Sequence, residues 1–67
     1  MTVCVLSGEE VGLLKSTPRR SLDLLIVIRP GYGVKEVRRL MKLAAPTLSE
    51  KGELIIAESL PAAFEQL

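Results

Sequence analysis

The five-residue segment Arg29-Pro30-Gly31-Tyr32-Gly33 has the residue types of a ligand-binding loop. Glycines let a backbone approach a ligand closely, and free N–H groups at the start of a following helix favour anions. Arg29, Lys35 and Arg38 add positive charge, and the Tyr32 ring can stack on a base. These features suit a nucleic acid or another phosphate-bearing ligand. The candidate binding residues are Arg29, Gly31, Tyr32, Gly33, Lys35, Arg38 and Arg39.

A simpler interpretation of the same segment is a tight turn between a strand and a helix, built from proline and glycine. Gly31-Tyr32-Gly33 is too short for a dinucleotide-binding fingerprint, which needs G-x-G-x-x-G. Both interpretations remain open from the residues alone.

Catalytic chemistry has little support, because the chain contains no histidine and only one cysteine, Cys4. A serine or cysteine nucleophile needs a base within hydrogen-bond reach, and histidine is the commonest one. One thiol can form neither an intrachain disulfide nor a thiolate zinc site. We therefore expect a non-enzymatic protein with no catalytic residue, no metal and no cofactor.

Three segments have the apolar character of strands. The first, residues 2–6, alternates β-branched and other apolar side chains. The second, residues 22–28, is an almost continuous apolar run, which is typical of a strand buried on both faces of a parallel sheet. The third, residues 53–58, follows a turn at Gly52. Two of the three strands are thus expected to need cover on both sides.

The most strongly predicted helix covers Val34 to Ala45. Its apolar residues recur at spacings of three and four, which places them on one buried stripe. Lys35, Arg38, Arg39 and Lys42 form its opposite, solvent-facing side.

Two shorter helices are predicted from their capping residues. Ser7 and Glu10 fit a capping box, which favours a short helix over residues 8–15. The alternative there is a hairpin turn at Gly8 followed by a second strand. Ser59, with Pro61 in the first turn, predicts a last helix over residues 62–67.

Together these elements predict one small α/β domain over residues 1–67, with a three-stranded, mainly parallel sheet. The order is strand, helix, strand, helix, strand, helix, because parallel strands need crossover connections.

Two of the strand segments resemble the later half of class I S-adenosylmethionine-dependent methyltransferases. Residues 21–27 resemble the "fDlvi" strand of that family, and residues 48–58 resemble its "LkpGGrLiiae" turn and strand. Residues 28–33 resemble the Asn-Pro-Pro-Tyr loop of amino-group methyltransferases, with Arg29 in place of the asparagine and Gly31 in place of the second proline. The family's glycine-rich cofactor loop has no counterpart here. The resemblance therefore implies a Rossmann-like fold and a partial or degenerate methyltransferase-like subunit that does not methylate alone.

Association with a partner is expected from the size of the chain. A domain of 67 residues buries only about 60% of its unfolded surface, so its core is marginal when alone. An intrachain disulfide is impossible with one cysteine and a metal is not expected, which leaves association or an unusually well packed small core; one strong helix covers only one sheet face. We expect a protein partner or a second copy to cover the rest. The predicted interface residues are Val11, Leu14, Leu60 and Phe64.

Charge is unevenly distributed, although the net charge is only +1. Residues 15–42 hold eight of the nine basic residues and two acidic ones, for a local charge of +6. This middle segment favours an anionic partner, such as nucleic acid, or contact between copies; the alternative is a set of solvated faces.

A membrane location is not expected. No run approaches the roughly 18 to 20 apolar residues that span a bilayer, and residues 1–6 lack the charged lead of a signal peptide. The expected location is the cytoplasm.

Overall fold

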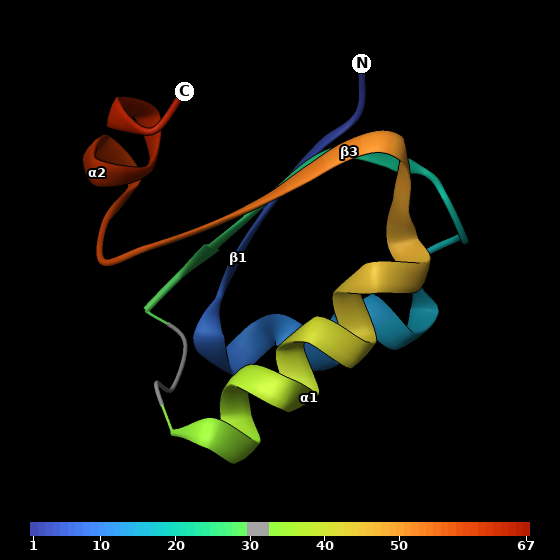
Figure 1. Cartoon of the computed structure of the whole chain (residues 1–67), viewed down its shortest axis with the longest axis horizontal. Coiled ribbons are helices and arrows are strands. Elements are labelled where there is room, and N and C mark those ends of the chain that lie inside the picture. Colours follow the sequence, from blue (N-terminus) through green and yellow to red (C-terminus); the bar gives the residue numbers. More distant parts are fainter. Residues whose placement is uncertain (30–32) are drawn as a thin grey trace.

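Three parallel strands form the sheet of the computed structural model, which describes residues 1–29 and 33–67. They are β1 (Val3–Ser7), β2 (Leu22–Ile28) and β3 (Leu48–Ala57), in the order β1-β2-β3. In Figure 1 the three strands lie between a layer of helices on one side and the short helix α2 (Leu60–Glu65) on the other. The small α/β fold is thereby confirmed.

The connections are helical, in the predicted places. The 3₁₀ helix η1 (Gly8–Ser16) joins β1 to β2, and α1 (Val34–Ala44) with the short η2 (Ala45–Thr47) leads into β3. The helix alternative is therefore correct for residues 8–15, although the hydrogen bonding is of 3₁₀ type. The Glu10 carboxylate accepts a hydrogen bond from the Ser7 N–H (3.0 Å), as the capping pattern predicts.

Both crossover helices lie on one face of the sheet. In Figure 1, η1 and α1 lie side by side below the strands, and α2 lies on the other side. The core beneath η1 and α1 contains Leu25 and Val27 of β2, packed with Leu40 and Leu14. A second, smaller core forms under α2.

The apolar run of β2 is divided between these two cores. Leu25 and Val27 point to the first, whereas Leu24 and Ile26 point to the second, with Ala63 of α2. All four side chains are buried. The predicted burial of this strand on both faces is confirmed, because alternating side chains of a strand face opposite sides.

β3 starts at Leu48, five residues earlier than predicted. Leu22 pairs with Leu48 and Leu24 pairs with Glu53, so β3 contains three extra residues between these two positions. Gly52 lies inside this bulge, where a Cβ would approach the Leu22 carbonyl oxygen to 2.6 Å. The sequence predicts a turn at Gly52, and the structure places that glycine in a close approach of two backbones.

No helix in residues 1–29 and 33–67 combines the length and the apolar character needed to cross a bilayer.

Candidate functional site

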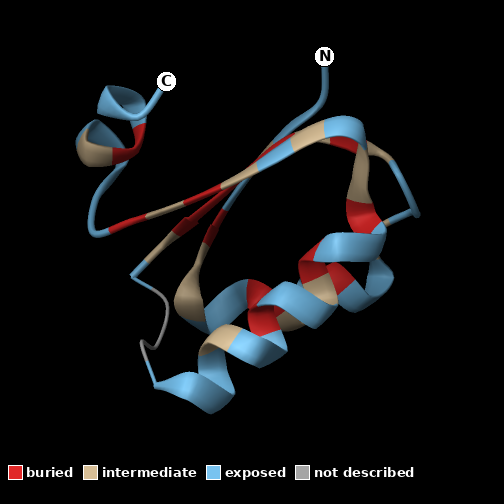
Figure 2. Cartoon of the chain, in the orientation of Figure 1, coloured by how far each residue is buried: buried red, intermediate tan, exposed pale blue. Residues whose placement is uncertain are grey.

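The sheet face opposite η1 and α1, here called the open face, is only partly covered. The six-residue helix α2 lies over β2 and β3 and buries Ala63 completely. Val3 and Val5 of β1 point to the same face and remain 49% and 48% exposed. Figure 2 shows the contrast between β1, which is largely exposed or half-buried, and the buried segments of β2 and β3.

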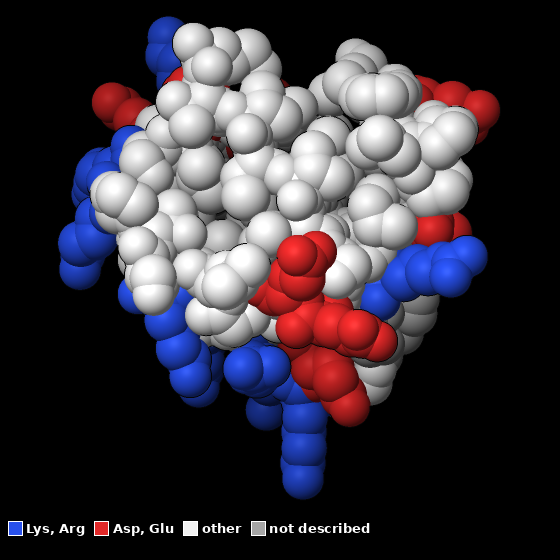
Figure 3. Space-filling model, turned by 180° about the vertical axis from the view of Figure 1, so that it is seen from behind, with Lys and Arg blue, Asp and Glu red and all other residues white. Residues whose placement is uncertain are grey.

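The helix that covers this face also contributes exposed apolar side chains. Leu60 and Phe64 of α2 are exposed, as is Leu67 after the helix, and Phe64 leaves 57% of its area open to solvent. In the space-filling view of Figure 3, charged side chains gather over the lower part of the molecule and uncharged residues occupy most of the upper part. Exposed apolar side chains such as these lose contact with water when another surface covers them, which lowers the free energy.

The free edge of β1 carries backbone groups that point away from the sheet. The Thr2 carbonyl accepts a hydrogen bond from the Leu24 N–H (3.2 Å), so Thr2 faces β2. Backbone direction alternates along a strand, so the N–H and C=O groups of Cys4 and Leu6 also point toward β2. Those of Val3 and Val5 point away from the sheet. Among the described strands, β1 has a neighbour only on its β2 side.

The opposite edge of the sheet is better protected. The Ala57 carbonyl accepts a hydrogen bond from the Arg29 N–H (2.9 Å), so the preceding carbonyl, of Ile56, points to the free edge of β3. There it accepts a hydrogen bond from Gln66 Nε2 (3.2 Å). The strand β3 also carries charged residues, Glu50, Lys51 and Glu53, whereas β1 has neither a charge nor a proline. Charged side chains and capped groups are common defences against edge pairing; β1 has no charged side chain, and its capped group is the Ser7 N–H at its end, which donates to Glu10.

The four predicted interface residues fall into two pairs. Leu60 and Phe64 are exposed on α2, beside the open face. Val11 and Leu14 lie in the chain's own core, 7% and 3% exposed, where they pack between η1, the sheet and α1. They are therefore not available to a partner, because α1 itself covers η1. Val3 and Val5, the exposed apolar residues of β1 on the open face, were not singled out from the sequence, although their alternation with Cys4 and Leu6 was the available signal.

Five of the seven predicted ligand-binding residues, Arg29, Gly33, Lys35, Arg38 and Arg39, belong to the described part of the chain. Gly31 and Tyr32 lie outside the described residues. Arg29 is exposed at the end of β2 in a left-handed conformation (φ 53°), and Gly33 is the N-cap of α1. The Glu36 carboxylate lies against Gly33, which puts a negative charge at the helix start where an anion would bind.

The basic side of α1 is present as predicted. Lys35, Arg38, Arg39 and Lys42 are all exposed, at spacings that place them on one side of the helix. A Cβ at Gly12 would lie 3.9 Å from an Arg39 guanidinium nitrogen, so Arg39 extends over η1.

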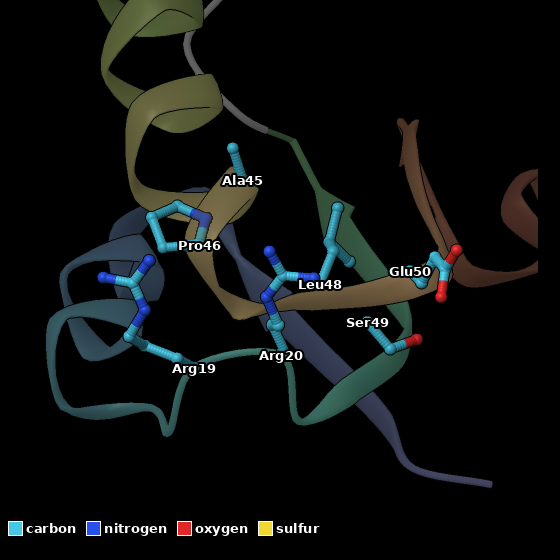
Figure 4. A pocket seen from close by; sticks show the side chains of 7 residues that line it. All are labelled: Arg19, Arg20, Ala45, Pro46, Leu48, Ser49 and Glu50. Atoms are coloured by element: carbon cyan, nitrogen blue, oxygen red, sulfur yellow. The ribbon is translucent and has the colours of Figure 1, made fainter.

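A surface hollow of about 400 Å³ lies at the other end of the sheet, next to the start of β3. Figure 4 shows Arg19 and Arg20 beside Pro46 and Leu48, with Glu50 at the far side. Arg20 adopts a left-handed conformation (φ 55°), and its N–H donates to the Pro46 carbonyl (2.9 Å). Two guanidinium groups suit a carboxylate or phosphate. The hollow lies at the amino ends of the strands, whereas ligands of α/β folds usually bind at the carboxyl ends, so Arg19 and Arg20 are not among the predicted ligand-binding residues.

A comparison of the chain with protein-family models, with curated proteins and with solved structures finds no match in any of the three.

Proposed function

We propose that this chain is a non-enzymatic interaction module that buries its open face and the adjoining β1 edge against a protein partner. The observation that carries the proposal is the exposure of Val3 and Val5 on the face where α2 buries Leu24 and Ile26 of β2 and Ile55 and Ala57 of β3. Both crossover helices lie on the other side of the sheet, and α2 is too short to extend over β1.

The physical gain comes from apolar surface removed from water. Full burial of a valine, leucine or phenylalanine side chain lowers the free energy by about 1.5–3 kcal/mol relative to leaving it in water. Covering the exposed halves of Val3, Val5 and Phe64 therefore contributes a few kcal/mol to the stability of a complex. A small domain with a marginal core benefits from such cover more than a large one. A partial methyltransferase-like subunit would need a partner for the same reason.

Solution mass tests the proposal directly. We expect sedimentation of the purified chain at micromolar concentration to show association, and Phe64→Glu to weaken it at least tenfold because a charge enters the apolar surface. Met41→Glu is the matched control, since Met41 is 51% exposed on α1, away from the open face. A compact monomer for the unmodified chain, or equal effects of the two variants, contradicts the proposal.

A second candidate function is the binding of an anionic polymer such as nucleic acid by the basic side of α1. The specific observation in its favour is that Lys35, Arg38, Arg39 and Lys42 all project to solvent from one side of one helix. Its test is binding to DNA or RNA as a function of salt, because each phosphate contact releases counterions. Affinity unchanged in the Arg38→Glu/Arg39→Glu double variant contradicts this function.

A further inference from the structure

We propose that the partner is a second copy of this chain, and that the two β1 strands pair antiparallel about Cys4 to form one continuous six-stranded sheet. This inference rests on the proposed function and specifies its partner and geometry. The two-fold axis passes between the Cys4 residues of the two copies.

The hydrogen-bonding groups of the free edge select this register. Val3 and Val5 point their N–H and C=O groups outward, whereas the outward N–H of Ser7 is already bonded to Glu10. In an antiparallel ladder, residues that exchange both hydrogen bonds alternate with residues that exchange none. Pairing about Cys4 places Val3 opposite Val5 of the second copy, and Val5 opposite its Val3. All outward groups of the two valines are then satisfied in both copies.

The neighbouring registers are less favourable. Pairing about Val5 places Val3 opposite Ser7, whose N–H is taken by Glu10. Pairing about Val3 places Val5 opposite Met1, which lies outside β1. The register about Cys4 is therefore the one that uses Val3 and Val5 completely and stays within the strand.

The side chains of β1 suit pairing with an identical strand. Val3–Ser7 contains no charged residue, so a two-fold axis brings no like charges together. On the open face, Val3 of one copy lies beside Val5 of the other, and two such cross-strand pairs cover apolar area that each copy leaves half-exposed. The edge of β3, with Glu50, Lys51 and Glu53 and a capped Ile56 carbonyl, lacks this self-complementarity.

The proposed register makes Cys4 a specific reporter. Cys4 is a free, half-buried thiol on the η1 side of the sheet. Opposite residues of a non-hydrogen-bonded pair have Cα atoms about 4.5 Å apart, which lies within the range that a disulfide spans. Diamide takes two electrons and two protons from the two thiols, becomes the hydrazine, and leaves one S–S bond between the copies.

The experiment uses the full chain in two states. In reductant, sedimentation is expected to give twice the monomer mass for the unmodified chain and for Cys4→Ser. With diamide at low micromolar protein, the unmodified chain is expected to form a disulfide-linked dimer within minutes. Ser7→Cys in the Cys4→Ser background moves the thiol away from the axis and is expected to cross-link at least tenfold more slowly.

Val5→Pro tests the backbone pairing. The Val5 N–H points away from β2, so proline removes an intermolecular donor while every β1–β2 hydrogen bond is kept. We expect the variant to lose dimerisation with an unchanged far-ultraviolet circular dichroism spectrum. Val5→Thr keeps the N–H and the β-branched shape, and it is expected to remain dimeric.

The outcomes separate this inference from the proposed function. The β1 pairing is overturned if the dimer survives Val5→Pro or if its Cys4 thiols do not cross-link. If such a dimer still dissociates on Phe64→Glu, it associates through the open face, and the proposed function stands. A monomer at all concentrations in reductant overturns both.

Discussion

The Asp23 carboxylate joins all three strands at the amino end of the sheet, with its closest hydrogen bond to Thr2. Oδ2 accepts from the Thr2 N–H (2.7 Å), and Oδ1 accepts from the Ser49 hydroxyl (3.0 Å). Thr2 precedes β1, Asp23 belongs to β2, and Ser49 lies in the bulged start of β3. These hydrogen bonds lower the pKa of Asp23, the Thr2 backbone bond most and the Ser49 hydroxyl next.

Replacement of Asp23 by asparagine is expected to lower the thermal unfolding temperature by a few degrees. The amide oxygen can accept from the Thr2 N–H while the amide NH2 donates to the Ser49 hydroxyl, so both hydrogen bonds become neutral and weaker than those of the carboxylate. Differential scanning fluorimetry measures the change. Asp23→Glu is the comparison variant, because it keeps the charge but moves the carboxylate oxygens. An unfolding temperature equal to that of the unmodified chain would show that the position of the oxygens relative to Thr2 and Ser49 is unimportant.

Acid is expected to destabilise the fold through two carboxylates. The pKa of Asp23 is lowered as described, and hydrogen bonds from Ser7, the backbone one first, lower the pKa of Glu10. A group with a lowered folded-state pKa stabilises the fold above its unfolded pKa, and that contribution disappears as the pH falls through the folded-state value. The loss should therefore begin near the ordinary values of 3.8 and 4.5 and increase below them. Unfolding temperature against pH tests this, and Asp23→Asn/Glu10→Gln is expected to flatten the acid side of the curve.

Gly52→Ala is expected to destabilise the chain by about 1–3 kcal/mol, because overpacking forces backbone shifts. The new Cβ would lie 2.6 Å from the Leu22 carbonyl oxygen and 2.9 Å from the Ser49 nitrogen, and neither backbone atom can move alone. Gly12→Ala is the matched control, since its nearest neighbour is an Arg39 side-chain nitrogen at 3.9 Å. That change should leave stability equal or raise it by up to about 1 kcal/mol. Chemical denaturation compares the two, and equal effects would argue against the close approach at Gly52.

Ala63→Glu is expected to detach α2 and expose the second core. Ala63 is fully buried against Leu24, Ile26 and Ile55, so a larger charged side chain cannot be accommodated there. The expected result is stronger binding of the dye ANS together with the loss of about one short helix by circular dichroism. Ala62→Glu, at a half-buried neighbouring position, is the control and should change dye binding much less.

Local patterns in the sequence determined most of the secondary structure. The continuous apolar run predicted β2 with its observed bounds, Leu22–Ile28, and the spacing of three and four predicted α1 to within one residue. The capping pattern at Ser7 and Glu10 favoured a helix over a hairpin, as observed. These features depend on interactions within a few residues, and the sequence displays such interactions directly.

Only the tertiary structure decided which surfaces are covered. Val11 and Leu14 have the same apolar character as Leu60 and Phe64, yet the first pair is buried because η1 and α1 share one face of the sheet. The early start of β3 depends on a backbone contact between Gly52 and Leu22, residues thirty positions apart. The exposure of Val3 and Val5 follows from the position of β1 at the sheet edge and from the short reach of α2. Burial is set by long-range packing, and for that reason the sequence predicted an uncovered face, while the fold separated Leu60 and Phe64, which are exposed beside it, from the buried Val11 and Leu14.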